Sequence, residues 1–355
     1  MESMTTLEAA EKWHISKRRV ERLCSEKRID GAERVGKTWR IPKDAPKPED
    51  GRATPFNRSA DMPVRPFVKW AGGKSQILEE IRRKYPAGLG QTVSKYAEPF
   101  VGGGAVLFDV LGRYDLKEVY VSDVNRELVA TYCAIRDHAA ELIETLQTFE
   151  GEYVPAVDER RKELYYANRD RFNFLKASGS ADVELAALFI FLNRTCFNGL
   201  YRVNSQGAYN VPQGRYKKPS IFDGPNVMAV SEKLQVAEIV CADFRDSRDF
   251  IDEKTFAYFD PPYRPLTSTA SFTSYAEGRF GDEEQAALAG FIDEMSQRGA
   301  HIVASNSDPK NADEQDDFFD KLYSRHNITR ISASRAINSV GGSRGKISEL
   351  LICND

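Results

Sequence analysis

Residues 96–108, with the sequence YAEPFVGGGAVLF, combine an apolar strand-like stretch, three consecutive glycines and the beginning of an apolar helix. Glycines in such a loop let the backbone approach a ligand closely, and a helix N-terminus favours ligand groups of negative charge. A second strand-like stretch ends at Asp123, about 20 residues later, where an acidic side chain is suited to hold two ribose hydroxyls. The third spaced glycine of a dinucleotide fingerprint is missing, so the loop alone fits a turn without a ligand equally well.

Strand-like and helical stretches alternate through most of the chain. This alternation predicts an α/β fold with an open, mostly parallel sheet and helices on both faces. The expected strands are 93–100, 119–123, 237–241, 255–260, 300–305, 328–332 and 347–353, with helical patterns between several of them, including 125–149 and 282–298. Residues 151–235 interrupt the alternation with helices and loops, and we expect them to form a separate subdomain.

The expected strand 255–260 leads into Asp260-Pro261-Pro262-Tyr263, which fits one unusual chemical task, the activation of an exocyclic amine. The N6 amine of adenine is a poor nucleophile because its lone pair is delocalised into the ring. The Asp260 carboxylate and the Pro261 carbonyl, pre-placed by a proline φ of about −65°, can accept both amino hydrogens and localise that lone pair. Tyr263 offers a face on which a flipped base can stack. The alternative is a strand-ending turn in which the prolines block further pairing.

Together with the stretch FVKWAGGK at 67–74, these segments resemble the Dam family of DNA adenine N6-methyltransferases. FVKWAGGK is similar to the family's cofactor motif, 100–104 to its F-x-G-x-G loop and 260–263 to its catalytic motif, in the order of the alpha group. The similarity covers roughly residues 65–355, through the further segments 189–194, 197–202, 209–212 and 214–219. It implies a Rossmann-like methyltransferase sheet, S-adenosylmethionine as the methyl donor and base flipping in double-stranded DNA.

The resemblance also implies which residues act. The catalytic residues would be Asp260, Pro261 and Tyr263, with Asp260 adjoining both cofactor and target amine. Asp123 would hold the cofactor ribose, and Asp243 with Phe244 would contact its adenine, although the local match there is weaker. The full set expected to contact the cofactor is Trp70, Lys74, Phe100, Gly102, Asp123, Asp243, Phe244 and Asp260.

Ten residues are expected to contact DNA. The residues that resemble the family's readers of GATC are Lys69, Leu200, Arg202 and Pro212. Phe197 stands where the family often has an aromatic side chain that enters the gap left by the flipped adenine, and Asn198 is expected to stabilise the opened pair. The residues expected to bind phosphates are Arg194, Arg215, Lys217 and Lys218.

Two alternatives remain open from the residues. Cytosine N4 methyltransferases share the geometry but more often have serine at the position of Asp260. A DNA-binding regulator with an inactive catalytic domain is the other alternative, and the intact Asp260, Tyr263 and glycine loop argue against it.

Composition limits the class of protein. With 355 residues, 41% hydrophobic and 29% charged, the sequence predicts a soluble globular chain without a membrane span or secretory signal. Five widely spaced cysteines without a C-x-x-C pair predict a reducing cytoplasm and no zinc site, and we expect no metal. We expect a monomer, and a cognate restriction endonuclease acting on the same site remains a possible partner.

The net charge of −3 conceals an uneven distribution. Residues 185–222 contain no Asp or Glu but five Lys and Arg, which is typical of a surface that faces phosphates, although 185–192 is also a buried apolar pattern. The acidic cluster at 313–320 is interpreted as a solvated helix face that points away from DNA.

The first 45 residues lie outside the Dam resemblance. Thr5 and Glu8 form a capping-box pattern for a helix through Trp13, Ser16 can cap a second helix over 17–28, and 32–41 predicts a short hairpin. This pattern resembles the winged helix-turn-helix of the excisionase and MerR-like families, and predicts a DNA-binding unit with helix 17–28 in a major groove. A domain that contacts protein is the alternative. The expected organisation is 1–45 for this unit, 46–65 for a proline-containing linker, 66–150 and 236–355 for the catalytic domain and 151–235 for target recognition.

Overall fold

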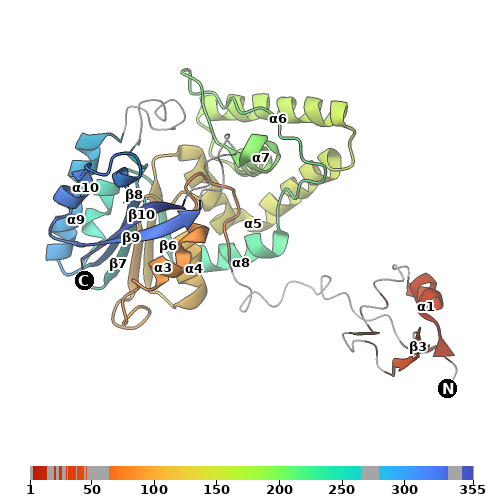
Figure 1. Cartoon of the computed structure of the whole chain (residues 1–355). Helices are drawn as coiled ribbons and strands as arrows, with labels where there is room; N and C mark the ends of the chain where they lie inside the picture. The colour runs from red at the N-terminus through yellow and green to blue at the C-terminus, as the bar shows by residue number, and fades with distance from the viewer. Residues whose placement is uncertain are drawn as a thin grey trace. The chain divides into compact units, whose positions relative to one another are not determined.

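The computed structural model describes residues 3–13, 20, 24–25, 29, 31–36, 38–43, 45, 64–264, 280–334 and 346–354. The chain divides into two compact units, Met1–Arg58 and Ser59–Asp355 (Figure 1).

A seven-stranded sheet with the order β6-β5-β4-β7-β8-β10-β9 forms the centre of the larger unit. Its strands are β4 (Lys95–Glu98), β5 (Glu118–Asp123), β6 (Ala237–Cys241), β7 (Thr255–Phe259), β8 (His301–Ser307), β9 (Asn327–Ser334) and β10 (Lys346–Cys353). The neighbouring strands β6, β5, β4, β7 and β8 pair in parallel, and β10 pairs antiparallel with both β8 and β9. The predicted mostly parallel sheet is therefore confirmed.

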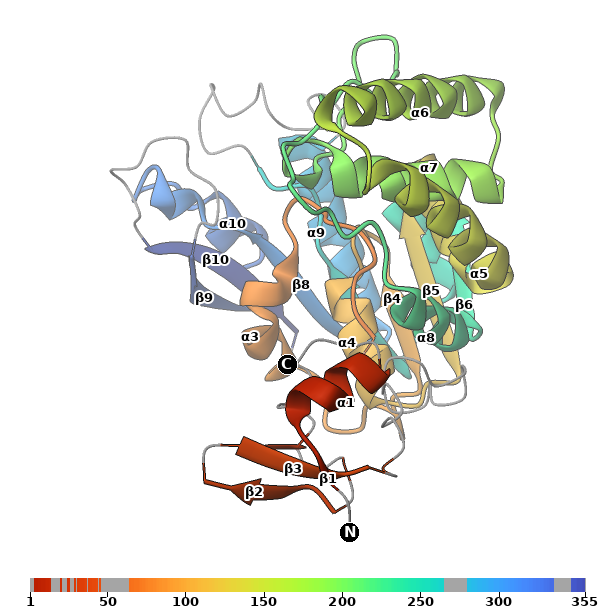
Figure 2. The ribbon, with the colours of Figure 1, turned by 90° about the vertical axis from the view of Figure 1, so that its right-hand side faces the viewer.

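Helices cover both faces of this sheet (Figure 2). One face carries α4 (Ala105–Arg113), α5 (Arg126–Tyr153) and α8 (Gly224–Leu234), and the other carries α9 (Asp282–Gln297) and α10 (Phe318–Leu322). A short helix, α3 (Leu78–Arg82), precedes β4. Successive strand residues alternate between the two cores, since side chains on a strand point alternately to opposite faces. Tyr96 lies in the core with α4 and α5, and its neighbour Ala97 lies in the core with α9.

The segment between α5 and α8 contains α6 (Asp158–Ser178), α7 (Val183–Thr195) and an irregular loop over 196–222. Helix α7 is almost entirely buried because it packs against both α5 and α6. Asp182 caps it by accepting a hydrogen bond from the Leu185 amide at 2.8 Å. Helix α7 belongs to the same apolar core as β4 and α5. The loop after it therefore starts from a helix that is packed into the main core of the unit.

The smaller unit has a three-stranded sheet of order β1-β3-β2, made of β1 (Ser3–Met4), β2 (Glu33–Val35) and β3 (Thr38–Pro42), and a helix α1 (Thr6–Trp13). The predicted capping box is present, because the Thr5 amide donates to Glu8 Oε2 at 2.7 Å and the Glu8 amide donates to Thr5 Oγ1 at 3.3 Å. The predicted hairpin is present as the antiparallel pair β2–β3. Most of the expected recognition helix 17–28 lies outside the described residues, as does 46–63 of the expected linker.

Candidate active site and DNA-contacting surface

The Asp-Pro-Pro-Tyr segment follows β7, whose five residues are all buried. Asp260 Oδ2 lies 2.8 Å from the ammonium of Lys74, and Asp260 Oδ1 accepts a hydrogen bond from Ser305 Oγ at 2.9 Å. Ser305 Oγ is in turn 2.9 Å from the hydroxyl of Tyr258. Burial raises the pKa of Asp260, while the Lys74 ammonium acts in the opposite direction. The carboxylate is thus held by two partners that are distant in sequence.

Lys74 was predicted from the sequence as a cofactor residue, and the structure adds a second relationship. Its side chain is only 5% exposed, its ammonium donates to the Gly72 carbonyl at 2.6 Å, and it lies 4.7 Å from the centre of the Tyr263 ring. The Tyr263 hydroxyl donates to Glu349 Oε2 on β10 at 2.8 Å. Lys74 therefore links the segment 67–74 directly to the Asp-Pro-Pro-Tyr segment.

Residues that the sequence did not single out hold the rest of this segment. Gln285 on α9 donates to the Pro262 carbonyl at 3.0 Å, and Arg264 binds Asp282 and Asp316 at 2.7 Å each. The polar run 305–308 at the end of β8 was a signal for Ser305, because such a run lies at the carboxyl edge of a parallel sheet, but it does not indicate Gln285 or Arg264.

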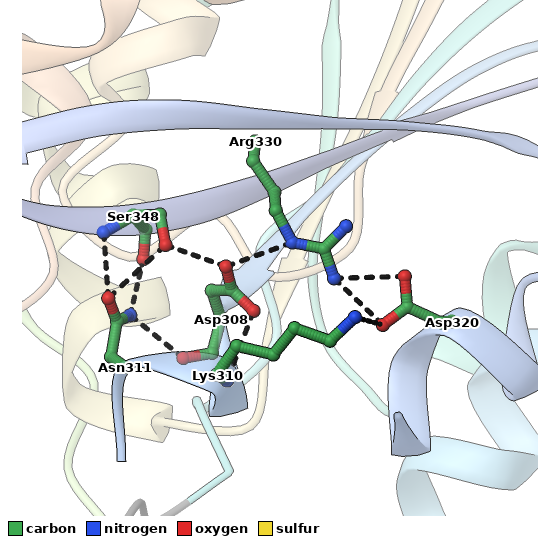
Figure 3. Close-up of polar contacts among 6 residues, drawn as sticks. All are labelled: Asp308, Lys310, Asn311, Asp320, Arg330 and Ser348. Carbon is green, nitrogen blue, oxygen red and sulfur yellow. Dashed lines mark hydrogen bonds and ion pairs between the residues drawn. The ribbon is translucent and has the colours of Figure 1, made fainter. Parts of the chain in front are cut away.

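The acidic cluster at 313–320 is solvated only in part and is mostly not helical, so its interpretation as one solvated helix face is wrong. Asp313 and Glu314 are exposed, whereas Asp316 and Asp320 form ion pairs. Helix α10 begins only at Phe318, and Asp316 pairs with Arg264, which directly follows the Asp-Pro-Pro-Tyr segment. Figure 3 shows that Asp320 binds both Arg330 of β9 and Lys310. In the same network the buried Asp308 accepts from Arg330 and from Ser348 Oγ on β10, at 3.1 and 2.6 Å. These contacts connect the end of β8 with β9 and β10.

The glycine loop lies between β4 and α4, as its sequence predicts. Gly102 and Gly104 adopt φ values of 47° and 71°, in the left-handed region that favours glycine. The Gly102 amide donates to Asp123 Oδ2 at 3.1 Å, and Asp123 Oδ1 accepts from the Asn125 amide at 2.8 Å. A Cβ on Gly102 would lie 2.8 Å from the Trp70 ring, so only glycine permits this approach. The predicted cofactor residues Trp70, Gly102 and Asp123 are therefore adjacent.

The remaining predicted cofactor residues form a second group. Phe100 and Phe244 stack with ring centres 5.6 Å apart and planes inclined by 28°. Asp243 caps the short helix Phe244–Asp249 and accepts a hydrogen bond from Arg245 Nη1 at 2.8 Å. Glycine backbone, aromatic rings and an acidic side chain at the carboxyl ends of parallel strands fit a nucleoside ligand such as S-adenosylmethionine.

Buried polar contacts join the segments predicted to contact DNA. Asn193 on α7 accepts from the Lys69 amide at 2.8 Å, and it donates to the carbonyls of Lys69 and Gly199 at 2.8 and 3.0 Å. The Phe197 amide donates to the Pro212 carbonyl at 2.8 Å. Phe197 is nevertheless 51% exposed, and the next residue, Asn198, has a φ of 56°. The structure therefore brings the 67–70 segment, the 197–199 turn and Pro212 together.

The basic residues differ in their surroundings. Arg202 is exposed, and its Nε donates to Asn210 Oδ1 at 2.7 Å, whereas Leu200 beside it is half-buried. Arg194 is half-buried and donates from Nε and Nη2 to the Phe67 carbonyl at 3.1 and 2.7 Å. Arg194 therefore also holds the segment that carries Lys69 in place. The side chains that are exposed on the following loop are Arg215, Lys217 and Lys218.

Among the described residues, no group of three or more His, Cys, Asp or Glu side chains is placed to hold a metal ion. Within the same part of the chain, no helix combines the length and apolar character that crossing a bilayer requires.

Comparison with known proteins identifies the class. The sequence profile of the D12 class of N6 adenine-specific DNA methyltransferases matches residues 70–337. The chain is 47% identical to the Type II methyltransferase M.MjaIII of Methanocaldococcus jannaschii, over 82% of this chain and 100% of that protein. It is 35% identical to the Type II methyltransferase M1.LlaDCHI of Lactococcus lactis, over 82% and 95%. It is 34% identical to the DNA adenine methylase of Escherichia coli K12, over 81% and 94%.

The predicted activity and methyl donor are thus established at the level of the family. The protein is an adenine-specific DNA methyltransferase that uses S-adenosylmethionine, and cytosine N4 methylation is set aside. The chain belongs to the D12 class of N6 adenine-specific DNA methyltransferases.

Proposed function

We propose that this enzyme methylates the adenine of GATC in duplex DNA, after rotating that base out of the helix. The proposal rests mainly on Phe197, an aromatic side chain that is 51% exposed. The turn that carries Phe197 is held in place, because Asn193 forms hydrogen bonds with both Lys69 and Gly199. An exposed ring on a rigid base can enter the space that a flipped adenine leaves, which offsets part of the unstacking cost.

The flipped adenine would be activated by the Asp-Pro-Pro-Tyr segment. Asp260 and the Pro261 carbonyl accept the two amino hydrogens and localise the nitrogen lone pair, while Tyr263 stacks on the base. Bound S-adenosylmethionine supplies an electrophilic methyl group, so the protein contributes orientation and the environment of the amine. Trp70, Gly102 and Asp123, with the Phe100–Phe244 stack and Lys74, would hold that donor.

Sequence recognition would come from the surface joined by Asn193. Arg202 can fork onto guanine, Leu200 can pack against a thymine methyl, and Lys69 and Pro212 border the same site. Arg194, Arg215, Lys217 and Lys218 would contact phosphates and fix the register. The absence of acidic residues over 185–222 supports this assignment.

The deciding experiment is expression of the chain in a host that lacks adenine methylation, followed by sequencing of modified bases. N6-methyladenine is expected in GATC. Digestion with GATC endonucleases of different methylation sensitivity gives an independent answer. Unmodified GATC beside N6-methyladenine in another sequence would exclude this specificity while leaving the activity intact.

Two substitutions should separate base contacts from phosphate contacts. Arg202→Ala is expected to cost ~1–3 kcal/mol of binding to GATC and to relax the recognised sequence. Lys217→Ala should weaken binding to all sequences alike and reduce the salt dependence by about one phosphate contact. Affinities for GATC and for duplexes changed at one base pair, measured over a salt series, check both expectations. Equal losses of discrimination in the two variants would contradict the assignment.

We also propose that the N-terminal unit binds DNA and performs no chemistry. Residues 1–52 contain 13 Lys and Arg against 10 Asp and Glu, whereas the rest of the chain is net acidic. The observed β2–β3 hairpin supports a winged architecture.

The two relatives named Type II methyltransferases support a restriction endonuclease of the same specificity as a partner.

Deletion of residues 1–52 is expected to leave methylation of short GATC duplexes largely unchanged. Affinity for long DNA should fall by about an order of magnitude or more, because a tethered second module raises the effective local concentration. Full-length and truncated proteins compared at matched salt on both substrates give the result. Equal affinity for long DNA would exclude DNA binding by this unit, and an inactive truncated protein would place it in the catalytic fold.

A further inference from the structure

The catalytic segment is held by a chain of side-chain amides. Gln285 Nε2 on α9 donates to the Pro262 carbonyl at 3.0 Å. Gln285 Oε1 accepts from Asn306 Nδ2 on β8 at 3.0 Å, and Asn306 Oδ1 accepts from the Ser307 amide at 2.9 Å. The chain therefore runs from the backbone of β8 to the peptide that follows the proposed acceptor carbonyl of Pro261.

The donor and acceptor in each of these hydrogen bonds are fixed by the bond between the Ser307 amide and Asn306. A backbone amide can only donate, so the atom of Asn306 that faces the Ser307 amide has to be oxygen. The amide nitrogen of Asn306 then faces Gln285 Oε1, and the nitrogen of Gln285 faces Pro262. The Pro262 carbonyl consequently accepts a hydrogen bond from Gln285, one peptide away from the proposed acceptor carbonyl of Pro261.

Gln285 is fully buried, with 0% exposure, and Asn306 is 1% exposed. Burying an amide is costly unless its hydrogen bonds are made, and an apolar side chain would fill the same position on α9 without that requirement. The first turn of α9 holds the segment at a second point, because Asp282 binds Arg264, two residues after Pro262. Gln285 and Asp282, both in the first turn of α9, therefore hold the backbone of residues 262–264 at two adjacent points.

We propose that Gln285 is a positioning residue for methyl transfer, which orients the Pro261–Pro262 backbone so that the Pro261 carbonyl meets the amine of the flipped adenine. Asn306 orients Gln285 in the same way. This inference rests on the proposed function of Asp260 and Pro261. Displacement of a reacting group by about 1 Å can cost on the order of 10²-fold in rate, so the predicted effect appears in the chemical step.

The test is the pH dependence of the single-turnover methylation rate of the variant Gln285→Glu. An ionised Glu at this position has no donor for the Pro262 carbonyl and repels it, whereas a neutral Glu reproduces the hydrogen-bonding pattern of Gln. Burial raises the pKa of a carboxyl, so between about pH 8.5 and about pH 6 the variant should pass from the ionised to the neutral form. The single-turnover rate, relative to the unsubstituted enzyme, should be about tenfold or more reduced at the higher pH and recover at the lower.

The variant is compared with the unsubstituted enzyme at each pH because both proteins carry the same charged groups around position 285. On the surrounding elements they are Asp282 with Arg264, Asp260 with Lys74, and Glu349, which accepts from the Tyr263 hydroxyl. Gln285→Leu should be slow at both pH values. Gln235→Glu is a control for the substitution itself and should retain the wild-type rate at both pH values, because Gln235 also donates to a backbone carbonyl, that of Arg136, but is exposed and lies outside the Asp-Pro-Pro-Tyr segment.

S-adenosylmethionine affinity and thermal unfolding are measured alongside. The affinity should change little in Gln285→Leu, whereas its unfolding temperature should fall, because the Pro262 carbonyl and the Asn306 amide lose a buried partner. Wild-type rates in Gln285→Glu at both pH values, or an equal loss without recovery at the lower pH, would overturn the inference. Asp260→Ala separates this outcome from a failure of the proposed function. An inactive Asp260→Ala beside fully active Gln285 variants removes only the role of Gln285, whereas an active Asp260→Ala removes the proposed catalytic segment itself.

Discussion

Replacement of Asp260 by alanine is expected to lower the rate of methyl transfer by a factor of about 10²–10³, equivalent to ~3–4 kcal/mol. Asp260 is proposed to accept one amino hydrogen of adenine from a position fixed by Lys74 and Ser305. A preorganised acceptor requires no rearrangement during the reaction, and its loss therefore raises the barrier itself. Asp260→Asn keeps the shape but removes the charge, and we expect a smaller loss.

The measurement is the single-turnover rate at saturating DNA and S-adenosylmethionine. Asp252→Ala is the matched control, because Asp252 forms an ion pair with Lys95 at 2.9 Å, at the opposite end of the strands β4 and β7. That variant should retain the wild-type rate. A near wild-type rate in Asp260→Ala would show that the amine is activated in another way.

Removal of the Tyr263 ring is expected to have the second largest effect. Stacking of a base on an aromatic side chain contributes ~1–3 kcal/mol, so Tyr263→Ala should lower kcat/KM correspondingly. Cofactor binding should be partly retained. The ring also lies over the Lys74 ammonium, and its loss would free Lys74 to shift away from Asp260.

Tyr263→Phe separates the ring from its hydroxyl. This variant keeps the stacking face and loses only the hydrogen bond to Glu349, for which we expect a cost of about 1 kcal/mol. Comparison of kcat/KM with S-adenosylmethionine affinity in both variants gives the result. If Tyr263→Phe were as impaired as Tyr263→Ala, the bond to Glu349, and not base stacking, would account for the role of Tyr263.

The sequence by itself determined the sheet and the order of its motifs. Apolar runs such as 255–259 are short, and turn residues bound them, so the pattern predicts strands without knowledge of their partners. The order of the motifs identified the family because each motif is a local stretch whose residue types follow from one task. Glycine at 102, where φ is 47°, is an example of such a local requirement.

Only the tertiary structure decided which side chains support the catalytic segment. Lys74 is 186 residues from Asp260 in the sequence, Ser305 is 45 residues away, and Glu349 is 86 residues from Tyr263. Asp316 and Asp320 of the acidic cluster were misinterpreted for the same reason, since their partners Arg264 and Arg330 lie outside that stretch of sequence. A charge or amide has the same appearance in a sequence whether it is solvated or paired. Its partner is set by strand order and helix packing, which bring distant residues to one edge of the sheet.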